Sequence, residues 1–76
     1  MAARRDSDAG LLRRAMVAYF RTGGTEQPSR ASGVQEHNGH RYVVLRAHSA
    51  TLAVYRIRND GMLKRVGRWP RELEQR

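Results

Sequence analysis

The chain has 76 residues and a mass of 8.7 kDa, which allows one small domain and excludes a large catalytic cleft. Hydrophobic residues make up 39% of it and charged residues 29%, so the core is expected to be thin. Lysine and arginine number 15 against 7 acidic residues, and the resulting net charge of +8 directs attention to polyanions as partners. The absence of cysteine excludes disulfides and thiolate sites and suits a reducing, cytoplasmic compartment.

Residues 1–7 are expected to form a flexible basic arm, because they carry Arg4 and Arg5 outside any apolar pattern. Residues 8–76 are expected to form a single small α+β domain. The longest apolar run near the start, residues 15–20, is too short for a signal sequence or a membrane span, so we expect no membrane association.

An amphipathic helix is predicted from about residue 8 or 9 to Arg21. Ser7 or Asp8 is a suitable N-cap, and the glycines at 23 and 24 supply the left-handed residue that ends a helix. A step of about 100° per residue defines a broad apolar arc. Its members are Leu11, Leu12, Ala15, Met16, Ala18, Tyr19 and Phe20. The opposite side carries Arg13, Arg14, Val17 and Arg21.

After a connector over residues 22–32, the apolar period becomes that of β-strands. Asn38-Gly39 predicts a two-residue hairpin that opposes His37 to His40 and Val34 to Val43. Strands are expected over 41–47 and 51–58, joined by a turn at 48–50. A three-residue loop at 59–61 with Gly61 as a bulge would then set Val54 opposite Val66, and Ile57 opposite Leu63.

The expected architecture is therefore one N-terminal amphipathic helix packed on a three- to four-stranded antiparallel β-meander. Pro70 fits the first turn of a short C-terminal helical turn. Trp69 and Leu73 are expected to pack back on the sheet edge or on the first helix.

Most of the positive charge belongs to the sheet. Between residues 41 and 71 there are eight basic residues and one acidic residue, Asp60, a balance of +7 (8 minus 1). The register places Arg56 opposite Lys64, although like charges facing each other destabilise a strand pair. We interpret this Arg-rich sheet face as a surface for an anion. The alternative is that the apolar stems of the arginines merely cover apolar residues while their charged heads are solvated. The predicted nucleic-acid-binding residues are Arg46, Arg56, Arg58, Lys64, Arg65, Arg68 and Tyr42.

Aromatic rings among cations are typical of single-strand binding, in which bases stack on the rings. Tyr42 is expected to serve in this way or, alternatively, to pack under the C-terminal segment, and Trp69 is expected in the core more than on the surface. Arg13, Arg14 and Arg21 on the helix form a secondary basic surface. His37 and His40 flank the first turn, close enough for one metal ion to touch both, and a third ligand would have to be Glu36 or come from elsewhere. Because histidines beside a turn are usually solvent-exposed polar residues, neither a metal nor another cofactor is expected.

The stretch Tyr55-Arg56-Ile57-Arg58 through Leu63-Lys64-Arg65-Val66 resembles the C-terminal hairpin of the RelE/ParE toxin superfamily. The resemblance implies an antiparallel sheet that presents basic residues to RNA on the ribosome or blocks gyrase. Two features depart from that family: a single N-terminal helix replaces its helical hairpin, and neither His nor Tyr follows the sheet. If the chain were a metal-independent RNase, the residues to suspect would be His48, Arg46 and Arg56.

The sequence favours a non-enzymatic protein that binds the phosphate backbone of DNA or RNA, as a monomer or a homodimer. One alternative is a small regulator that binds an acidic protein, of the kind carried by phages and other mobile elements. A second alternative is the toxin or RNase.

Overall fold

The computed structural model describes residues 7–47 and 50–74, and it is an α+β fold. Along the chain, α1 (Asp8–Arg21) is followed by four strands and a short 3-10 helix. The strands are β1 (Gly33–His37), β2 (His40–Ala47), β3 (Ala50–Ile57) and β4 (Leu63–Val66), and the 3-10 helix is η1 (Arg71–Glu74). Of the arm expected at 1–7, all but Ser7 lies outside the described residues.

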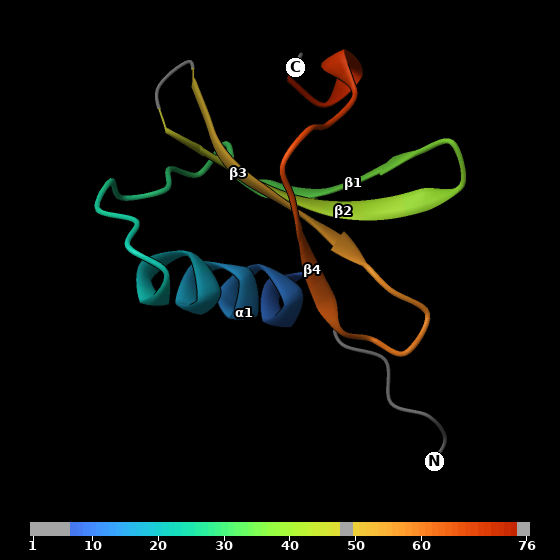
Figure 1. Cartoon of the computed structure of the whole chain (residues 1–76), viewed down its shortest axis with the longest axis horizontal. Coiled ribbons are helices and arrows are strands. Elements are labelled where there is room, and N and C mark those ends of the chain that lie inside the picture. Colours follow the sequence, from blue (N-terminus) through green and yellow to red (C-terminus); the bar gives the residue numbers. More distant parts are fainter. Residues whose placement is uncertain (1–6, 48–49, 75–76) are drawn as a thin grey trace.

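Helix α1 begins and ends where its capping residues predict. The Ser7 hydroxyl accepts a hydrogen bond from the Gly10 amide at 3.1 Å, which satisfies one donor at the helix start. At the other end the Thr22 amide donates to the Ala18 carbonyl, and Gly23 adopts a φ of 105°. The buried residues Leu11, Ala15 and Tyr19 recur every fourth position and belong to one cluster with side chains of the sheet. Figure 1 shows α1 lying along one face of the sheet.

The sheet is an antiparallel meander in the order β1-β2-β3-β4, and its predicted registers are confirmed. His37 opposes His40 across a turn in which Asn38 and Gly39 have φ values of 53° and 81°. Both values are positive, as a two-residue hairpin turn of this kind requires. In the last hairpin, Gly61 has a φ of 87° and Arg56 opposes Lys64.

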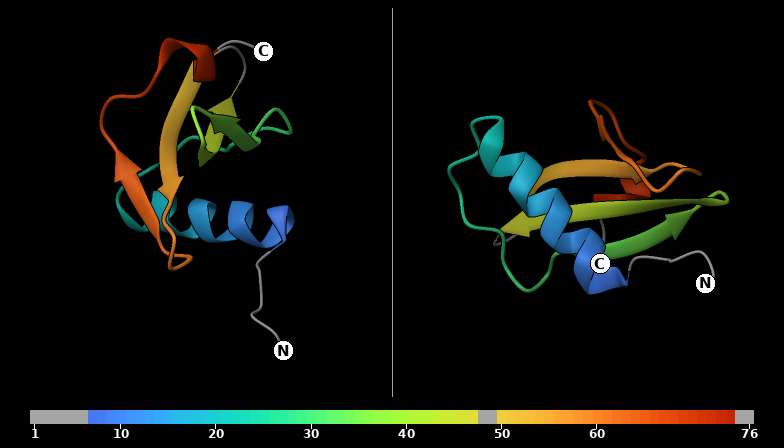
Figure 2. Two further views of the ribbon diagram at one scale, coloured as in Figure 1. Left: turned by 90° about the vertical axis from the view of Figure 1, so that its right-hand side faces the viewer. Right: turned by 90° about the horizontal axis from the view of Figure 1, so that it is seen from below.

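Both faces of the sheet are covered (Figures 1 and 2). On one face, α1 packs on side chains that include Val43, Leu45, Ala53 and Tyr55. On the other face, Leu73 and Trp69 of the C-terminal segment pack against the sheet. Their neighbours there are Tyr42, Val44 and Val54. The thin core therefore consists of two small clusters on the two sides of one sheet.

Two packing predictions need correction. Of the two places expected for Trp69 and Leu73, the first helix was wrong: the C-terminal segment contacts the edge strand β1, and both side chains pack on the second face of the sheet, away from the cluster that α1 builds on the first face. Phe20, which the apolar arc placed toward the sheet, is 41% exposed. The neighbouring Tyr19 takes the buried position instead, and the two rings meet edge to face at 5.2 Å between their centroids.

Replacing Gly24 by alanine is expected to lower the free energy of unfolding by about 1–3 kcal/mol, the usual cost of overpacking. A Cβ at this position would overlap the ring of Tyr19. That ring is buried, and its hydroxyl accepts from the Glu26 amide at 3.3 Å, so it has little room to move. Urea denaturation monitored by circular dichroism measures the difference.

Gly33→Ala is the matched control for this substitution, because a Cβ there meets nothing within 4 Å. Its unfolding midpoint should equal that of the wild type or exceed it slightly. Equal losses of stability in the two variants would contradict the assignment of the Gly24 effect to Tyr19.

Candidate nucleic-acid interface

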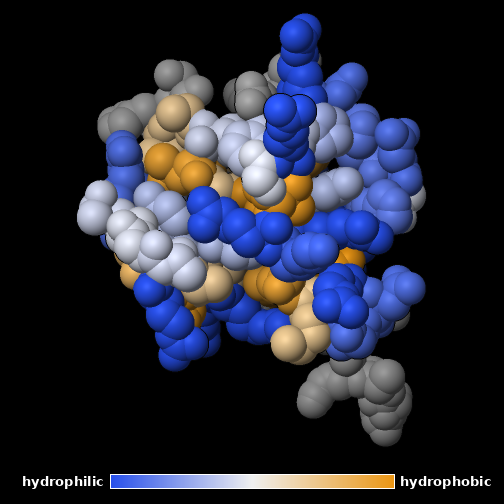
Figure 3. All heavy atoms as spheres, in the orientation of Figure 1, coloured by the Kyte–Doolittle hydropathy of each residue, from blue (hydrophilic) through white to orange (hydrophobic). Residues whose placement is uncertain are grey.

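The β3–β4 hairpin and the residues directly after it carry a group of exposed cations, which we call the basic strip. Hydrophilic side chains predominate over the right-hand part of the molecule, where the hairpin lies (Figure 3). The strip consists of five residues, each exposed to solvent: Arg56, Arg58, Lys64, Arg65 and Arg68. The only acidic side chain of the hairpin turn is that of Asp60, which lies 3.7 Å from the guanidinium of Arg58.

Arg56 is the centre of the strip, because it lines three adjoining surface hollows of about 410, 360 and 350 Å³. The first hollow continues toward the hairpin turn, past Arg58 and Lys64. The second runs toward Arg68 and the chain that leads to η1. The three hollows together have six lysine and arginine residues and one acidic residue in their walls, so the charge of this surface is predominantly positive.

Arg56 and Lys64 face each other on the side of the sheet that carries the C-terminal segment. Among the described residues, no hydrogen bond or ion pair engages the side chains of Arg56, Lys64 or Arg68. These three cations are therefore available to an external anion. A sheet selected for stability alone would gain from an acidic or neutral partner opposite Arg56.

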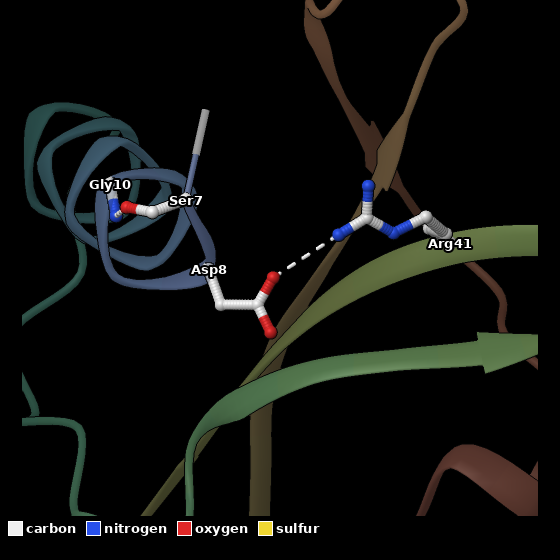
Figure 4. A network of polar contacts seen from close by, with 4 residues as sticks. All are labelled: Ser7, Asp8, Gly10 and Arg41. Carbon is white, nitrogen blue, oxygen red and sulfur yellow. Dashed lines mark hydrogen bonds and ion pairs between the residues drawn. The ribbon is translucent and has the colours of Figure 1, made fainter. Parts of the chain in front are cut away.

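Other basic residues are already engaged within the domain. Arg41 donates to the carboxylate of Asp8 at 3.1 Å and so ties β2 to the first turn of α1 (Figure 4). Arg14 donates to the Gly61 carbonyl at 3.0 Å, which ties the helix to the β3–β4 turn. The basic residues therefore fall into two groups. Arg14 and Arg41 make contacts that hold the fold together, whereas the side chains of Arg56 and Lys64 make no hydrogen bond or ion pair with another described residue.

Arg46 does not lie on the exposed surface that we expected, because it is only 6% exposed. Its guanidinium lies under the C-terminal segment and donates to the carbonyl of Leu73 and, at 3.2 Å, to that of Ala31. The Gln35 amide oxygen, in the orientation that satisfies both groups, accepts from the two terminal nitrogens at 3.1 and 2.9 Å. Arg46 thus joins the connector, β1 and η1 through hydrogen bonds within the domain.

Tyr42 is also unsuited to the role expected of it in stacking. Its side chain is 9% exposed and belongs to the cluster formed with Val44, Val54 and Leu73. The alternative, a residue that packs under the C-terminal segment, is confirmed. Trp69 is half-buried and packs against the same cluster, so it lies between the core position that was favoured and an exposed one.

Arg65 points to the other side of the hairpin from Lys64. Its register partner is Tyr55, and its guanidinium carbon lies 5.7 Å from the centroid of that ring, in cation–π geometry. The cations of the strip therefore lie on both sides of the sheet at strand β4. Arg13 and Arg21 of the secondary surface are exposed on α1, which covers the face of the sheet opposite to Arg56 and Lys64.

The described histidines, His37 and His40, lie on the two sides of the first hairpin turn. No set of three or more His, Cys, Asp or Glu residues in the part of the chain that the structure describes could hold a metal ion. His37 instead lies 3.9 Å from the Glu72 carboxylate. His48, which the RNase hypothesis requires, lies outside the described residues, and the burial of Arg46 removes a second member of that group.

Sequence reasoning missed Arg41 and Asn59, which join Arg56 and Arg58 in lining the third hollow. The place of Arg41 could have been found from the register of β2 and β3. Arg41 pairs with Ile57, so it lies beside the end of β3, next to Arg56 and Arg58.

Replacing Lys64 by glutamate is expected to stabilise the domain, by less than about 1 kcal/mol for an exposed cross-strand pair. The substitution removes the repulsion with Arg56 and forms an ion pair in its place. For a domain of this size such a gain raises the melting temperature by up to a few degrees, which differential scanning calorimetry at low salt measures.

Lys64→Gln separates the two causes, because it removes the repulsion without forming a new pair. Its melting temperature should lie between those of the wild type and the glutamate variant. A melting temperature below that of the wild type in both variants would show that Lys64 supports the fold.

Comparisons of the chain with protein-family models, with curated proteins and with solved structures found no match. No helix in the described part of the chain is long and apolar enough to cross a membrane.

Proposed function

We propose that this domain binds nucleic acid without catalysis, by contacts between the basic strip and backbone phosphates. The observation that carries the proposal is the opposed pair Arg56 and Lys64. Both side chains are exposed and make no hydrogen bond or ion pair with another described residue, and they line two surface hollows together, while Arg56 lines a third as well. Guanidinium groups offer paired N–H donors that match the oxygens of a phosphate, and four of the five cations in the strip are arginines. We expect the protein to act in the cytoplasm.

The driving force would be the release of counterions from the nucleic acid. Each phosphate neutralised by a cation of the strip frees condensed ions, so the affinity should fall steeply as salt is added. Because no described element presents a set of side chains suited to reading base edges, we expect little sequence preference. Arg46 and Tyr42 have no part in this proposal, since both are buried.

Fluorescence anisotropy of labelled DNA and RNA against the purified protein, titrated at several salt concentrations, tests the proposal. Submicromolar binding with a log–log salt slope of several units would support simultaneous contact with several phosphates. Binding no tighter than about millimolar to any nucleic acid at moderate salt would contradict it, because non-specific binding usually reaches about 10⁻⁴ to 10⁻⁶ M. That result would favour an acidic protein as the partner.

A further inference from the structure

We infer that the ligand of the basic strip is a double-stranded nucleic acid held by its phosphates, and not a single strand with stacked bases. This inference rests on the proposed function and adds the class of ligand. It follows from two features of the strip, namely the lack of an open aromatic ring beside it and the regular spacing of the hairpin backbone that carries it.

The aromatic side chains, all in the described part of the chain, offer no stacking platform beside the strip. Tyr19, Tyr42 and Tyr55 are at most 9% exposed, and Arg65 lies over the ring of Tyr55. Phe20 is exposed, but it belongs to α1 on the opposite layer from Arg56. Trp69 borders the strip and uses its ring to pack on the second core cluster.

Stacking matters because it supplies much of the affinity of single-strand binders, about 1–3 kcal/mol per base. A single strand bound to this surface would lose conformational freedom without that compensation. A duplex already has its phosphates in fixed positions, so it loses less freedom on binding. It also carries about one charge per 1.7 Å of axis, twice the density of one strand.

The hairpin sets the spacing of the backbone positions from which the cations of the strip extend. Arg56 and Arg58 are two residues apart near the end of β3, about 7 Å along the chain. Lys64 lies on the neighbouring strand, about 5 Å away in the direction of the backbone hydrogen bonds. The Arg58 amide donates to the Met62 carbonyl at 2.8 Å, which closes the turn between the strands. Such a regular spacing suits a ligand whose own charges lie at fixed positions.

The test compares a blunt DNA duplex, an RNA duplex and an unstructured single strand, each with the same number of phosphates. Anisotropy gives the affinities and salt slopes, and the emission of Trp69, the single tryptophan of the chain, reports stacking. With all five cations engaged, the salt slope should be about 4.5 for a DNA duplex against about 3.5 for the single strand. We expect at least one duplex to bind more tightly than the single strand, with little change in Trp69 emission.

Tighter binding of the single strand, with quenching of Trp69, would overturn this inference and leave the proposed function standing. Equal affinity for duplex and single strand would overturn it as well. Absence of binding to all three ligands would instead overturn the proposed function.

Discussion

Replacing Arg56 and Lys64 together by glutamine is expected to weaken duplex binding at least about a hundredfold at moderate ionic strength. Each substitution removes a hydrogen bond between a charged donor and a phosphate, worth about 1.5–3 kcal/mol, and about 1.4 kcal/mol corresponds to a tenfold change in affinity. The slope of log affinity against log salt should fall by about two, one unit for each lost contact. Anisotropy titrations at several salt concentrations measure both quantities. The fold should survive, because both side chains are exposed and uncommitted.

The matched control replaces Arg13 and Arg21 by glutamine, which lowers the net charge equally, from +8 to +6 (8 minus 2). These residues are exposed on α1, in the opposite layer of the molecule from Arg56 and Lys64. At about 0.1 M salt the Debye length is about 10 Å, so their loss should change the affinity by less than about threefold. Equal weakening by the two double variants would mean that binding follows net charge and that no dedicated surface exists.

Val54→Asp is expected to leave the domain largely unfolded at room temperature. Val54 is fully buried on the second face of the sheet, between Val44 and Val66, and in the cluster with Leu73. A carboxylate in this position has no partner and costs several kcal/mol, while the stability of so small a domain is about 5 kcal/mol or less. Far-UV circular dichroism should show the loss of the sheet.

Val17→Asp is the control, because Val17 is 53% exposed on the outer side of α1. Valine and aspartate have similar helix propensities, and the new carboxylate lies four residues from both Arg13 and Arg21. Its unfolding midpoint should match that of the wild type or exceed it slightly. A folded Val54→Asp variant would contradict the assignment of Val54 to a sealed core.

The turns were the part of the fold that could be predicted best. Asn38-Gly39 and Gly61 need positive φ values, and each such position fixes the register of the strands on both sides of it. The opposition of Arg56 and Lys64 followed from a Gly61 bulge, which was preferred to a two-residue Asp-Gly turn because it pairs apolar residues across the strands. The centre of the candidate site was therefore predictable from turn chemistry together with the apolar pattern.

What covers each face of the sheet could not be predicted in the same way. The alternation of side chains tells which residues share a face, but it does not tell whether another segment lies over that face. Arg46 shares its face with Tyr42, as expected, yet the C-terminal segment covers both. One feature of the sequence does indicate that both faces are covered. The residues of β2 from Tyr42 to Leu45 are apolar on both faces, as expected for a strand that is buried on two sides.

The meander order of the sheet also bears on how fast the protein folds. Every strand pairs with the strand that follows it, so each pairing closes a short loop and loses little chain entropy. The longer closures are the docking of α1 on one face and of the C-terminal segment on the other. Chains dominated by local pairings fold faster than those that must join distant segments. We therefore expect the hairpins to form early and the two covering layers to dock onto them afterwards.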